Sequence, residues 1–306
     1  MSAASQQSPI SAAPALRLTA EERAVFDRDG FVIRRKFVTD AELAPLAEAC
    51  LGDPEIDGAL VGIADSQGNM QEVVTWTDLT QPDMLTVIPR MARFVDASED
   101  LLGRPVYHWH SKLSMKRPGS AGRWDWHQDY AYWYFEGCLY PDMLTATIAV
   151  DHTDEANGCL KLVAGSHKLG RIEHNKIGMA SGVDPERLAL IEQRHRVVSC
   201  VMEPGDVVFF HGNTLHASGP NVSDRPRTLL HMSYNAIDNS PFVAEGQDHH
   251  KYKPLAKMSD DSMIKRDWKT ALTGQPFWSR TGEASGSRST YGYTLLRPAR
   301  PKVVAG

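Results

Sequence analysis

The chain has 306 residues, of which 42% are hydrophobic and 23% charged, with a formal net charge of -5 and a pI near 6.2. This composition is ordinary for a globular protein that can bury a sizeable core. No run of five or six like charges occurs, so nothing in the sequence supports binding to nucleic acid or docking on a membrane. We expect a small molecule as the partner, and a monomer or a homodimer.

The N-terminal end and the cysteines bear on location. Residues 1–18 are expected to form a flexible tail, because the first fourteen are rich in Ser, Ala, Gln and Pro and have neither the positive nor the apolar region of a secretion signal. The four cysteines stand far apart, without CxxC spacing or the density of a disulfide scaffold. These features favour a reducing, cytoplasmic location.

The first hundred residues are predicted to be mixed, with helices prominent. Thr19 can cap a helix that ends at Gly30. Thr39 and Glu42 have the spacing of a capping box for a second helix. The expected elements are helices at about 19–30, 39–50 and 84–102 and a short strand at 31–33.

After Leu102 the pattern changes to alternating segments rich in β-branched and aromatic residues, which is typical of strands. Several short strands without long helices between them favour an antiparallel barrel or a double-sheet jelly roll. We expect strands at 106–116, 144–151, 159–163, 197–202, 206–210 and 228–235, and a helical insertion at 181–194.

One domain over residues 19–306 is expected, because single barrel or sandwich domains reach this size. It would consist of a helical N-terminal support at about 19–102, a jelly-roll core at about 103–240 and a C-terminal extension at 241–306, whose role the sequence leaves open.

The first candidate site is the run Trp126-His127-Gln128-Asp129. In an extended segment residues two apart project to the same side, so His127 and Asp129 can both reach one ion while Gln128 faces away. A His from a distant strand would complete a facial triad, which leaves iron(II) open positions for co-substrate and oxygen. An HxD triplet alone also occurs by chance as a surface pair, so it needs a second signal.

The second signal is the segment HGNTLHASGPNVSDRPR at residues 211–227. It offers two candidate third ligands, His211 and His216, with Ser218 and two arginines downstream.

Together these segments resemble the phytanoyl-CoA dioxygenase family of iron(II)- and 2-oxoglutarate-dependent oxygenases, including its ectoine-hydroxylase-like bacterial branch. The resemblance extends from about Thr19 to Asn235 and is densest from Lys116. It rests on four blocks in order: WHQDYAYW at 126–133, NGCLKLVAGSH at 157–167, EPGDVVFFHG at 203–212 and LHASGPNVSDRPR at 215–227. The expected fold class is therefore mainly β with flanking helices, a double-stranded β-helix (jelly-roll or cupin-like) barrel.

The resemblance implies that His127, Asp129 and His216 hold the metal, with His211 as the rival to His216. It also implies that the arginine eleven residues past the distal His, Arg227, pairs with the distal carboxylate of 2-oxoglutarate. A guanidinium offers a planar fork that suits this role. Arg225 is the alternative, and Ser218 and Lys112 are expected to assist in binding the co-substrate.

Strand parity supports this assignment. One face of the segment after Pro226 carries Arg227, Leu229, His231, Ser233 and Asn235. One face of the segment at 106–116 carries His110, Lys112, Ser114 and Lys116, opposite Trp109, Leu113 and Met115. If the apolar faces pack on helices, the polar faces line the barrel; otherwise they meet solvent.

Aromatic residues after Asp129 could line the substrate pocket or belong to the core. His152, His249 and His250 are expected at the surface. The candidate pocket residues are His110, Ser114, Tyr130, Trp133 and His231.

The function that the resemblance implies is hydroxylation of an unactivated C–H bond with iron(II), 2-oxoglutarate and O2, releasing succinate and CO2. Related halogenases replace the carboxylate ligand by a small residue, and this chain retains Asp129, so hydroxylation is preferred; desaturation or cyclisation needs the same ligands. Polar candidate pocket residues favour a small polar substrate, an amino acid or a natural-product intermediate. The alternatives are a non-catalytic metal-containing jelly-roll binding module, which would not need Arg227, and a metal-dependent hydrolase, which would need an additional Glu base.

Overall fold

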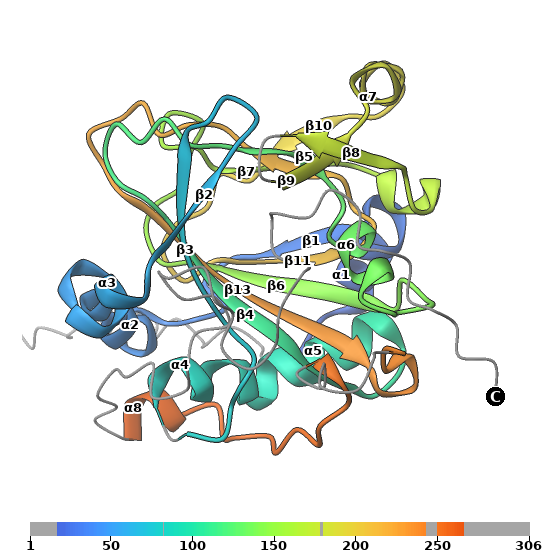
Figure 1. Ribbon diagram of the computed structural model, residues 1–306. Helices are drawn as coiled ribbons and strands as arrows, with labels where there is room; N and C mark the ends of the chain where they lie inside the picture. The colour runs from blue at the N-terminus through green and yellow to red at the C-terminus, as the bar shows by residue number, and fades with distance from the viewer. Residues whose placement is uncertain (1–16, 82, 178–179, 243–249, 266–306) are drawn as a thin grey trace, which may run out of the picture.

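The computed structural model describes residues 17–81, 83–177, 180–242 and 250–265. In this part of the chain two β-sheets face each other, and helices cover the outer face of the larger sheet (Figure 1). Two facing antiparallel sheets are the jelly-roll arrangement that the sequence predicts. Most of the predicted N-terminal tail and of the C-terminal extension, and His249, lie outside the described residues.

The predicted helix starts are confirmed. Thr19 and Thr39 both form complete capping boxes, with Glu22 and Glu42 respectively. Gly30 ends the first helix in the left-handed conformation, φ 82°. The helices are α1 (Ala20–Asp29), α2 (Asp40–Gly52), α3 (Pro54–Ala59), α4 (Met84–Val87), α5 (Ala92–Leu102), α6 (Asp129–Phe135), α7 (Pro185–Glu192) and α8 (Ser262–Lys265), with short 3-10 helices η1 (Ile88–Arg90), η2 (Ser166–Leu169) and η3 (Ile237–Asn239).

One expected helix is interrupted. The stretch 84–102 was expected as a single helix but consists of α4, η1 and α5, and Met91 between them is extended. Pro89 lies at the break and has no N–H to continue the helical hydrogen bonding. The predicted insertion at 181–194 does contain a helix, α7, which follows a short hairpin.

All strand pairs are antiparallel. The larger sheet has the order β1 (Phe31–Arg34), β11 (Val207–His211), β6 (Met143–Ala149), β13 (Arg227–Ala236), β4 (Val106–Lys116), β3 (Met70–Trp76) and β2 (Val61–Ala64). The smaller sheet has the order β10 (Val197–Ser199), β7 (Leu160–Val163), β12 (His216–Ser218) and β5 (Trp124–His127), and β8 (His174–Ile177) pairs with β9 (Ala180–Val183).

The six strands predicted after Leu102 and the short one at 31–33 are all present. The expectation that further strands begin only after Leu102 is wrong, because β2 and β3 precede it and β3 pairs with β4. Neither β5 nor β12 was predicted as a strand of its own. β12 has three residues and β5 four, too few for an alternating pattern to emerge.

Strands β13 and β4 separate the main core from the space between the sheets. Leu230 and Met232 on β13, with Leu113 on β4, pack in the core under the helices. The intervening residues, among them Arg227 and His231, face the smaller sheet and line a cavity there. The predicted polar faces therefore line the interior, and the alternative that they meet solvent is wrong.

A register shift between Ser233 and Tyr234 disturbs this parity. Trp109 was expected on the helix-facing side with Leu113 and Met115, but it packs in a separate aromatic cluster with Tyr130 and Trp133. A bulge moves the side chains beyond it to new surroundings.

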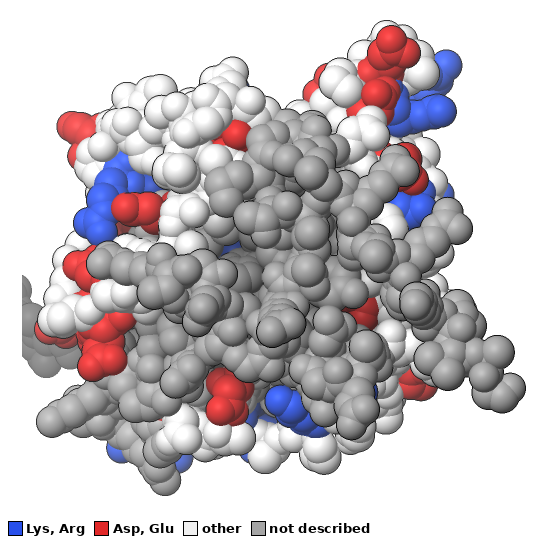
Figure 2. All heavy atoms as spheres, in the orientation of Figure 1, with Lys and Arg blue, Asp and Glu red and all other residues white. Residues whose placement is uncertain are grey.

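Three further features concern the surface and the cysteines. In the described part of the chain no helix combines the length and apolar character needed to cross a bilayer. All four cysteines are free. Figure 2 shows acidic and basic side chains next to one another around α7.

A buried ion pair joins the helical layer. The guanidinium of Arg93 on α5 bonds both carboxylate oxygens of Glu42 on α2, and it also donates to the carbonyl of Phe37 at 2.9 Å and to Asp260 at 3.2 Å. Arg93 and Glu42 are both buried. The pair thus ties α2, α5 and the segment before α8 to one another.

Removing one partner of this pair should destabilise the fold, because the remaining charge is left buried without compensation. We expect Glu42→Ala to lower the free energy of unfolding by about 3 kcal/mol, measured by urea denaturation. Glu48→Ala, at an exposed position of the same helix, should change it by less than about 0.5 kcal/mol. Equal effects of the two substitutions would contradict the role of the ion pair.

Candidate metal centre

Two neighbouring strands bring the two histidines together. In the pairing of β5 with β12, His127 lies directly opposite His216. Both side chains are buried, and the centroids of their rings are 4.1 Å apart. Antiparallel pairing of two short strands thus juxtaposes residues that are 89 positions apart in the sequence.

Asp129 lies next to the two histidines, but not in the strand position that the sequence predicted. The strand ends at His127, and Asp129 is the first residue of α6, so the two do not share a strand face. Between them Gln128 is fully buried; its amide donates to the carbonyls of Gly170 and Asn213, and its oxygen accepts from the N–H of Ile172. Gln128 therefore anchors the turn that directs Asp129 towards the histidines.

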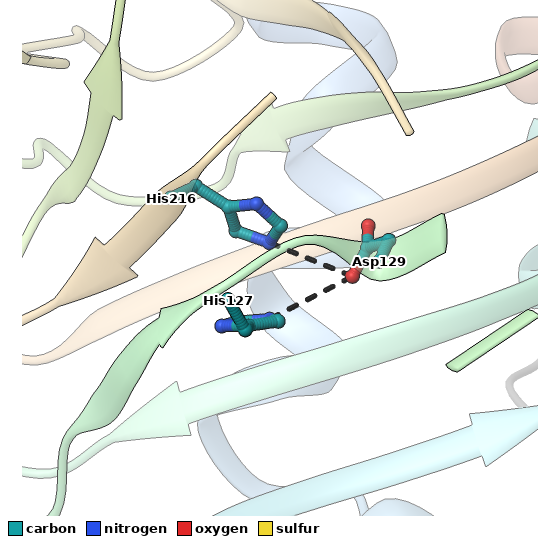
Figure 3. A group of neighbouring side chains, drawn as sticks. All are labelled: His127, Asp129 and His216. Atoms are coloured by element: carbon teal, nitrogen blue, oxygen red, sulfur yellow. Dashed lines mark ion pairs between the residues drawn. The ribbon is translucent and has the colours of Figure 1, made fainter. Parts of the chain in front are cut away.

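The three side chains converge on one point (Figure 3). Asp129 Oδ1 lies 3.7 Å from His127 Nε2 and 3.5 Å from His216 Nε2. The candidate ligand atoms all lie within 4.8 Å of one another. Two imidazoles and one carboxylate on one side of a point are the donor set of the facial triad that binds non-haem iron(II) with open positions.

Hydrogen bonds orient each of the three side chains. His127 Nδ1 contacts the carbonyl of Asp125 at 2.7 Å, and His216 Nδ1 contacts the carbonyl of Thr214 at 2.9 Å. A carbonyl oxygen can only accept a hydrogen bond, so Nδ1 of each ring is the donor and carries the proton. Each ring therefore presents an unprotonated Nε2 to a metal. The second carboxylate oxygen, Asp129 Oδ2, accepts from Thr145 at 3.3 Å.

The electrostatics suit this assignment. Burial lowers the pKa of His127 well below its ordinary value, and the neighbouring His216 lowers it further. Burial would raise the pKa of Asp129, but His216, His127 and Lys112 outweigh burial and keep this pKa below its ordinary value. A neutral His127 and an ionised Asp129 are the forms that bind a divalent cation.

The rival residues lie elsewhere. His211 contacts the rings of Phe26 and His167, and its Nδ1 accepts from the N–H of Asn213. Arg225 is exposed and pairs with Asp154.

The triad lines a pocket between the two sheets, where the empty space, part of it open solvent, is about 460 Å³. Its lining includes six predicted residues of the co-substrate site or substrate pocket. They are His110, Lys112, Ser114, Ser218, Arg227 and His231. Tyr130 and Trp133 are not part of the lining and pack in the aromatic cluster behind it.

Arg227 is buried in the wall of the cavity. It is 1% exposed, and its Nη1 donates to the carbonyl of Ser114 at 3.1 Å. Its Nε and Nη2 have no hydrogen-bond partner among the described residues. Burial lowers the pKa of Arg227 to about 10, so it stays charged at neutral pH. A buried guanidinium with one complete edge unpartnered fits a bidentate carboxylate.

The structure places Thr145, which the sequence did not single out, next to the triad. Thr145 lies on β6, where residues 144–148 alternate between apolar side chains and threonine, but this alternation does not show that the hydroxyl of Thr145 contacts Asp129. Ser233 bonds Thr145 at 2.9 Å and also lines the cavity. The expectation that His250 lies at the surface is wrong, since it is buried and stacks on Trp109 with ring centroids 4.0 Å apart.

The chain is similar to several known proteins. A family model described as Phytanoyl-CoA dioxygenase (PhyH) matches residues 26–229. An ectoine dioxygenase from Bordetella parapertussis is 31% identical over 240 residues, which cover 73% of this chain and 77% of the relative. An L-proline trans-4-hydroxylase from Streptomyces griseoviridis is 30% identical over 189 residues, 56% of this chain and 68% of that protein. The crystal structure of EctD from S. alaskensis with 2-oxoglutarate and 5-hydroxyectoine has a TM-score of 0.65 and 26% identity, covering 82% of this chain and 90% of that one.

The geometry predicts which histidine a metal needs. His216→Ala should abolish stoichiometric binding of Mn(II) or Co(II), measured by equilibrium dialysis under argon, because it removes one of three donors. His211→Ala should bind the metal as the wild type does. Loss of binding in the His211 variant alone would reverse the assignment.

Thr145 should affect metal affinity through Asp129. Thr145→Val keeps the side-chain shape but removes the donor to Asp129 Oδ2, and we expect the dissociation constant for Co(II) to rise by about tenfold. Thr145→Ser should restore most of the affinity. If the Val and Ser variants bind Co(II) equally, the hydroxyl does not orient the carboxylate.

Proposed function

Since the chain belongs to the phytanoyl-CoA dioxygenase family of iron(II)- and 2-oxoglutarate-dependent oxygenases, we propose that its cavity hydroxylates a C–H bond of a small polar molecule. In this proposal His127, Asp129 and His216 hold the iron, and Arg227 with Ser218 holds the distal carboxylate of 2-oxoglutarate. Lys112 assists from the adjacent strand.

The observation that carries the proposal is the unpartnered edge of Arg227 in the cavity that the triad also lines. An uncompensated buried charge costs several kcal/mol. A carboxylate that binds there removes this cost, and its molecule extends towards the triad. A jelly roll that only stores a metal has no need for such an arginine.

Bound iron and 2-oxoglutarate supply the oxidising chemistry, with O2 as oxidant and with succinate and CO2 as products. The side chains of this protein hold and orient the iron and the co-substrate. Asp129 presents Oδ1 to the ion because Thr145 holds Oδ2. Leu160, Phe210 and Leu229 cover the apolar part of the cavity wall and restrict water.

Lys112 contributes positive charge from β4. Its ammonium lies 4.6 Å from the centre of the Trp124 ring, and the residue is half-buried. Burial lowers the pKa of Lys112, while the nearby Asp129 raises it. Lys112 pairs in register with His231, whose Nδ1 contacts Thr147 at 2.8 Å. Along β13 this pair of residues lies between Arg227 and Ser233. We call the pair Lys112 and His231 a layer of the cavity.

The substrate side of the cavity is polar. Beyond the layer of Lys112 and His231 lie His110 and Ser233, which pair in register, and Thr145. Relatives are named for ectoine and L-proline, both small polar molecules. We therefore propose an amino acid or a similarly small polar compound as the substrate.

Formation of succinate from 2-oxoglutarate tests the proposal, with ectoine, L-proline and other amino acids screened for the gain of one oxygen atom in mass. We expect Arg227→Met to raise the 2-oxoglutarate concentration needed for half-maximal rate by about tenfold or more, because it removes a charge-assisted bidentate contact. Arg225→Met should match the wild type within about twofold.

Two results would oppose the proposal. If the Arg225 variant loses activity and the Arg227 variant keeps it, the co-substrate is bound elsewhere. If the metal-loaded wild type does not bind 2-oxoglutarate, the assigned cavity is wrong.

A further inference from the structure

The turn between His127 and Asp129 is held by a histidine that lies far away in the sequence. Gln128, the residue of this turn, donates its backbone N–H to Nε2 of His174 at 2.8 Å. His174 is the first residue of β8, in the hairpin that precedes α7. It does not line the cavity, so any effect that it has on the metal must act through the turn.

Both ring nitrogens of His174 have a partner. Nδ1 lies 2.8 Å from the carbonyl oxygen of Ile172. Because a carbonyl oxygen can only accept, Nδ1 carries the proton and Nε2 is the acceptor for the N–H of Gln128. Burial lowers the pKa of His174 to about 4, so the neutral ring that makes both contacts is the form present at neutral pH.

The same segment also holds the side chain of Gln128. The N–H of Ile172 donates to Oε1 of Gln128 at 2.7 Å, and Nε2 of Gln128 donates to the carbonyl of Gly170 at 2.8 Å. A further bond from Nε2 reaches the carbonyl of Asn213. Of these four hydrogen bonds of Gln128, three involve residues 170–174. The start of the hairpin is therefore the main anchor of the turn.

An apolar cluster fixes the hairpin on the smaller sheet. Ile172 packs with Val183 of β9 and Ile191 of α7, against Val163 of β7. In the pairing of β8 with β9, His174 lies opposite Val183. The position of His174 thus follows from the packing of the hairpin and of α7 on the sheet, and the turn is fitted to it.

The orientation of Asp129 depends on this anchor. α6 begins at Asp129, and the side chain of Gln128 does not cap the helix. If His174 offered no acceptor, the N–H of Gln128 would be buried without a partner, which folded proteins avoid. The turn would have to move to satisfy this N–H. That movement would displace Asp129 on one side of Gln128 and His127 on the other.

We propose that His174 is a positioning residue for the metal: its Nε2 holds the backbone N–H of Gln128 so that His127 and Asp129, on either side, face His216. The hairpin of β8 and β9 then has a function, which is to set the metal affinity from outside the cavity. The inference rests on the proposed function, since it takes these three residues as the ligands.

Two amide variants of His174 that differ in reach test this role. Gln places its amide near the position of the imidazole Nε2, whereas Asn places it near that of Nδ1. We expect His174→Asn to raise the dissociation constant for Co(II) by about tenfold or more, because the partners behind metal ligands have effects of this size. His174→Gln should stay within about threefold of the wild type. Equilibrium dialysis under argon measures both.

The visible absorption of bound Co(II), which reports the geometry of its ligands, is the second readout. At saturating Co(II) the spectrum of His174→Asn should differ from that of the wild type, and the spectrum of His174→Gln should match it. His195→Asn is the matched control. His195 is a half-buried histidine that follows α7, and its Nδ1 contacts the carbonyl of Ala164 at 3.0 Å. This variant should change neither the affinity nor the spectrum.

Equal effects of the Asn and Gln substitutions at position 174, or of His174→Asn and His195→Asn, would overturn the role of His174. If His174→Asn yields no folded protein, His174→Phe is measured instead. It keeps a ring beside Tyr132 but offers no acceptor, so the same loss is expected and the same results overturn the role.

The outcomes for the inference and for the proposed function can be told apart. If the wild type binds Co(II), His216→Ala abolishes the binding and His174→Asn leaves it unchanged, the triad stands and this inference is rejected. Failure of the wild type to bind Co(II) would reject both.

Discussion

The pairing of β5 with β12 is the constraint on which the rest of the site depends. These short strands place His127 opposite His216, and the backbone carbonyls of Asp125 and Thr214 fix both rings with Nε2 directed to the same point. The turn at Gln128 then has only to bring one carboxylate to that point. Because a single strand cannot surround an ion, the triad exists only when both strands are paired.

Positive side chains outnumber negative ones at and near the cavity. Lys116 on β4 lies opposite Arg227 on β13, and Lys112 also lies on β4. Asp129 is the one acidic residue in the described lining of the cavity. A divalent cation bound by the triad adds more positive charge. In the function that we propose, a dianionic co-substrate with one carboxylate at each end compensates the charges of the metal and of Arg227. Folding alone gives no reason to keep Nε and Nη2 of Arg227 buried without partners.

Local patterns predicted much of the fold and of the site. Capping residues located the starts of α1 and α2, and alternation along β4 and β13 identified the side chains that line the cavity. Strand parity did not predict the position of Trp109. A register shift between β13 and β4 places its side chain in the aromatic cluster and not on the helix-facing side. The expected geometry of His127 and Asp129 was wrong although their proximity was right, because a strand ends and a helix begins between them. The contacts of Lys116, Thr145 and His250 could not be predicted, since they depend on tertiary neighbours that no local pattern encodes.

The most direct test of the site is a crystal structure of the protein with Mn(II) and 2-oxoglutarate, prepared without oxygen. We expect density for the metal between His127 Nε2, Asp129 Oδ1 and His216 Nε2, and the distal carboxylate of 2-oxoglutarate against Nε and Nη2 of Arg227. Metal bound at His211, or 2-oxoglutarate bound with its distal carboxylate away from Arg227, would contradict the assignment of this cavity as the site of the reaction.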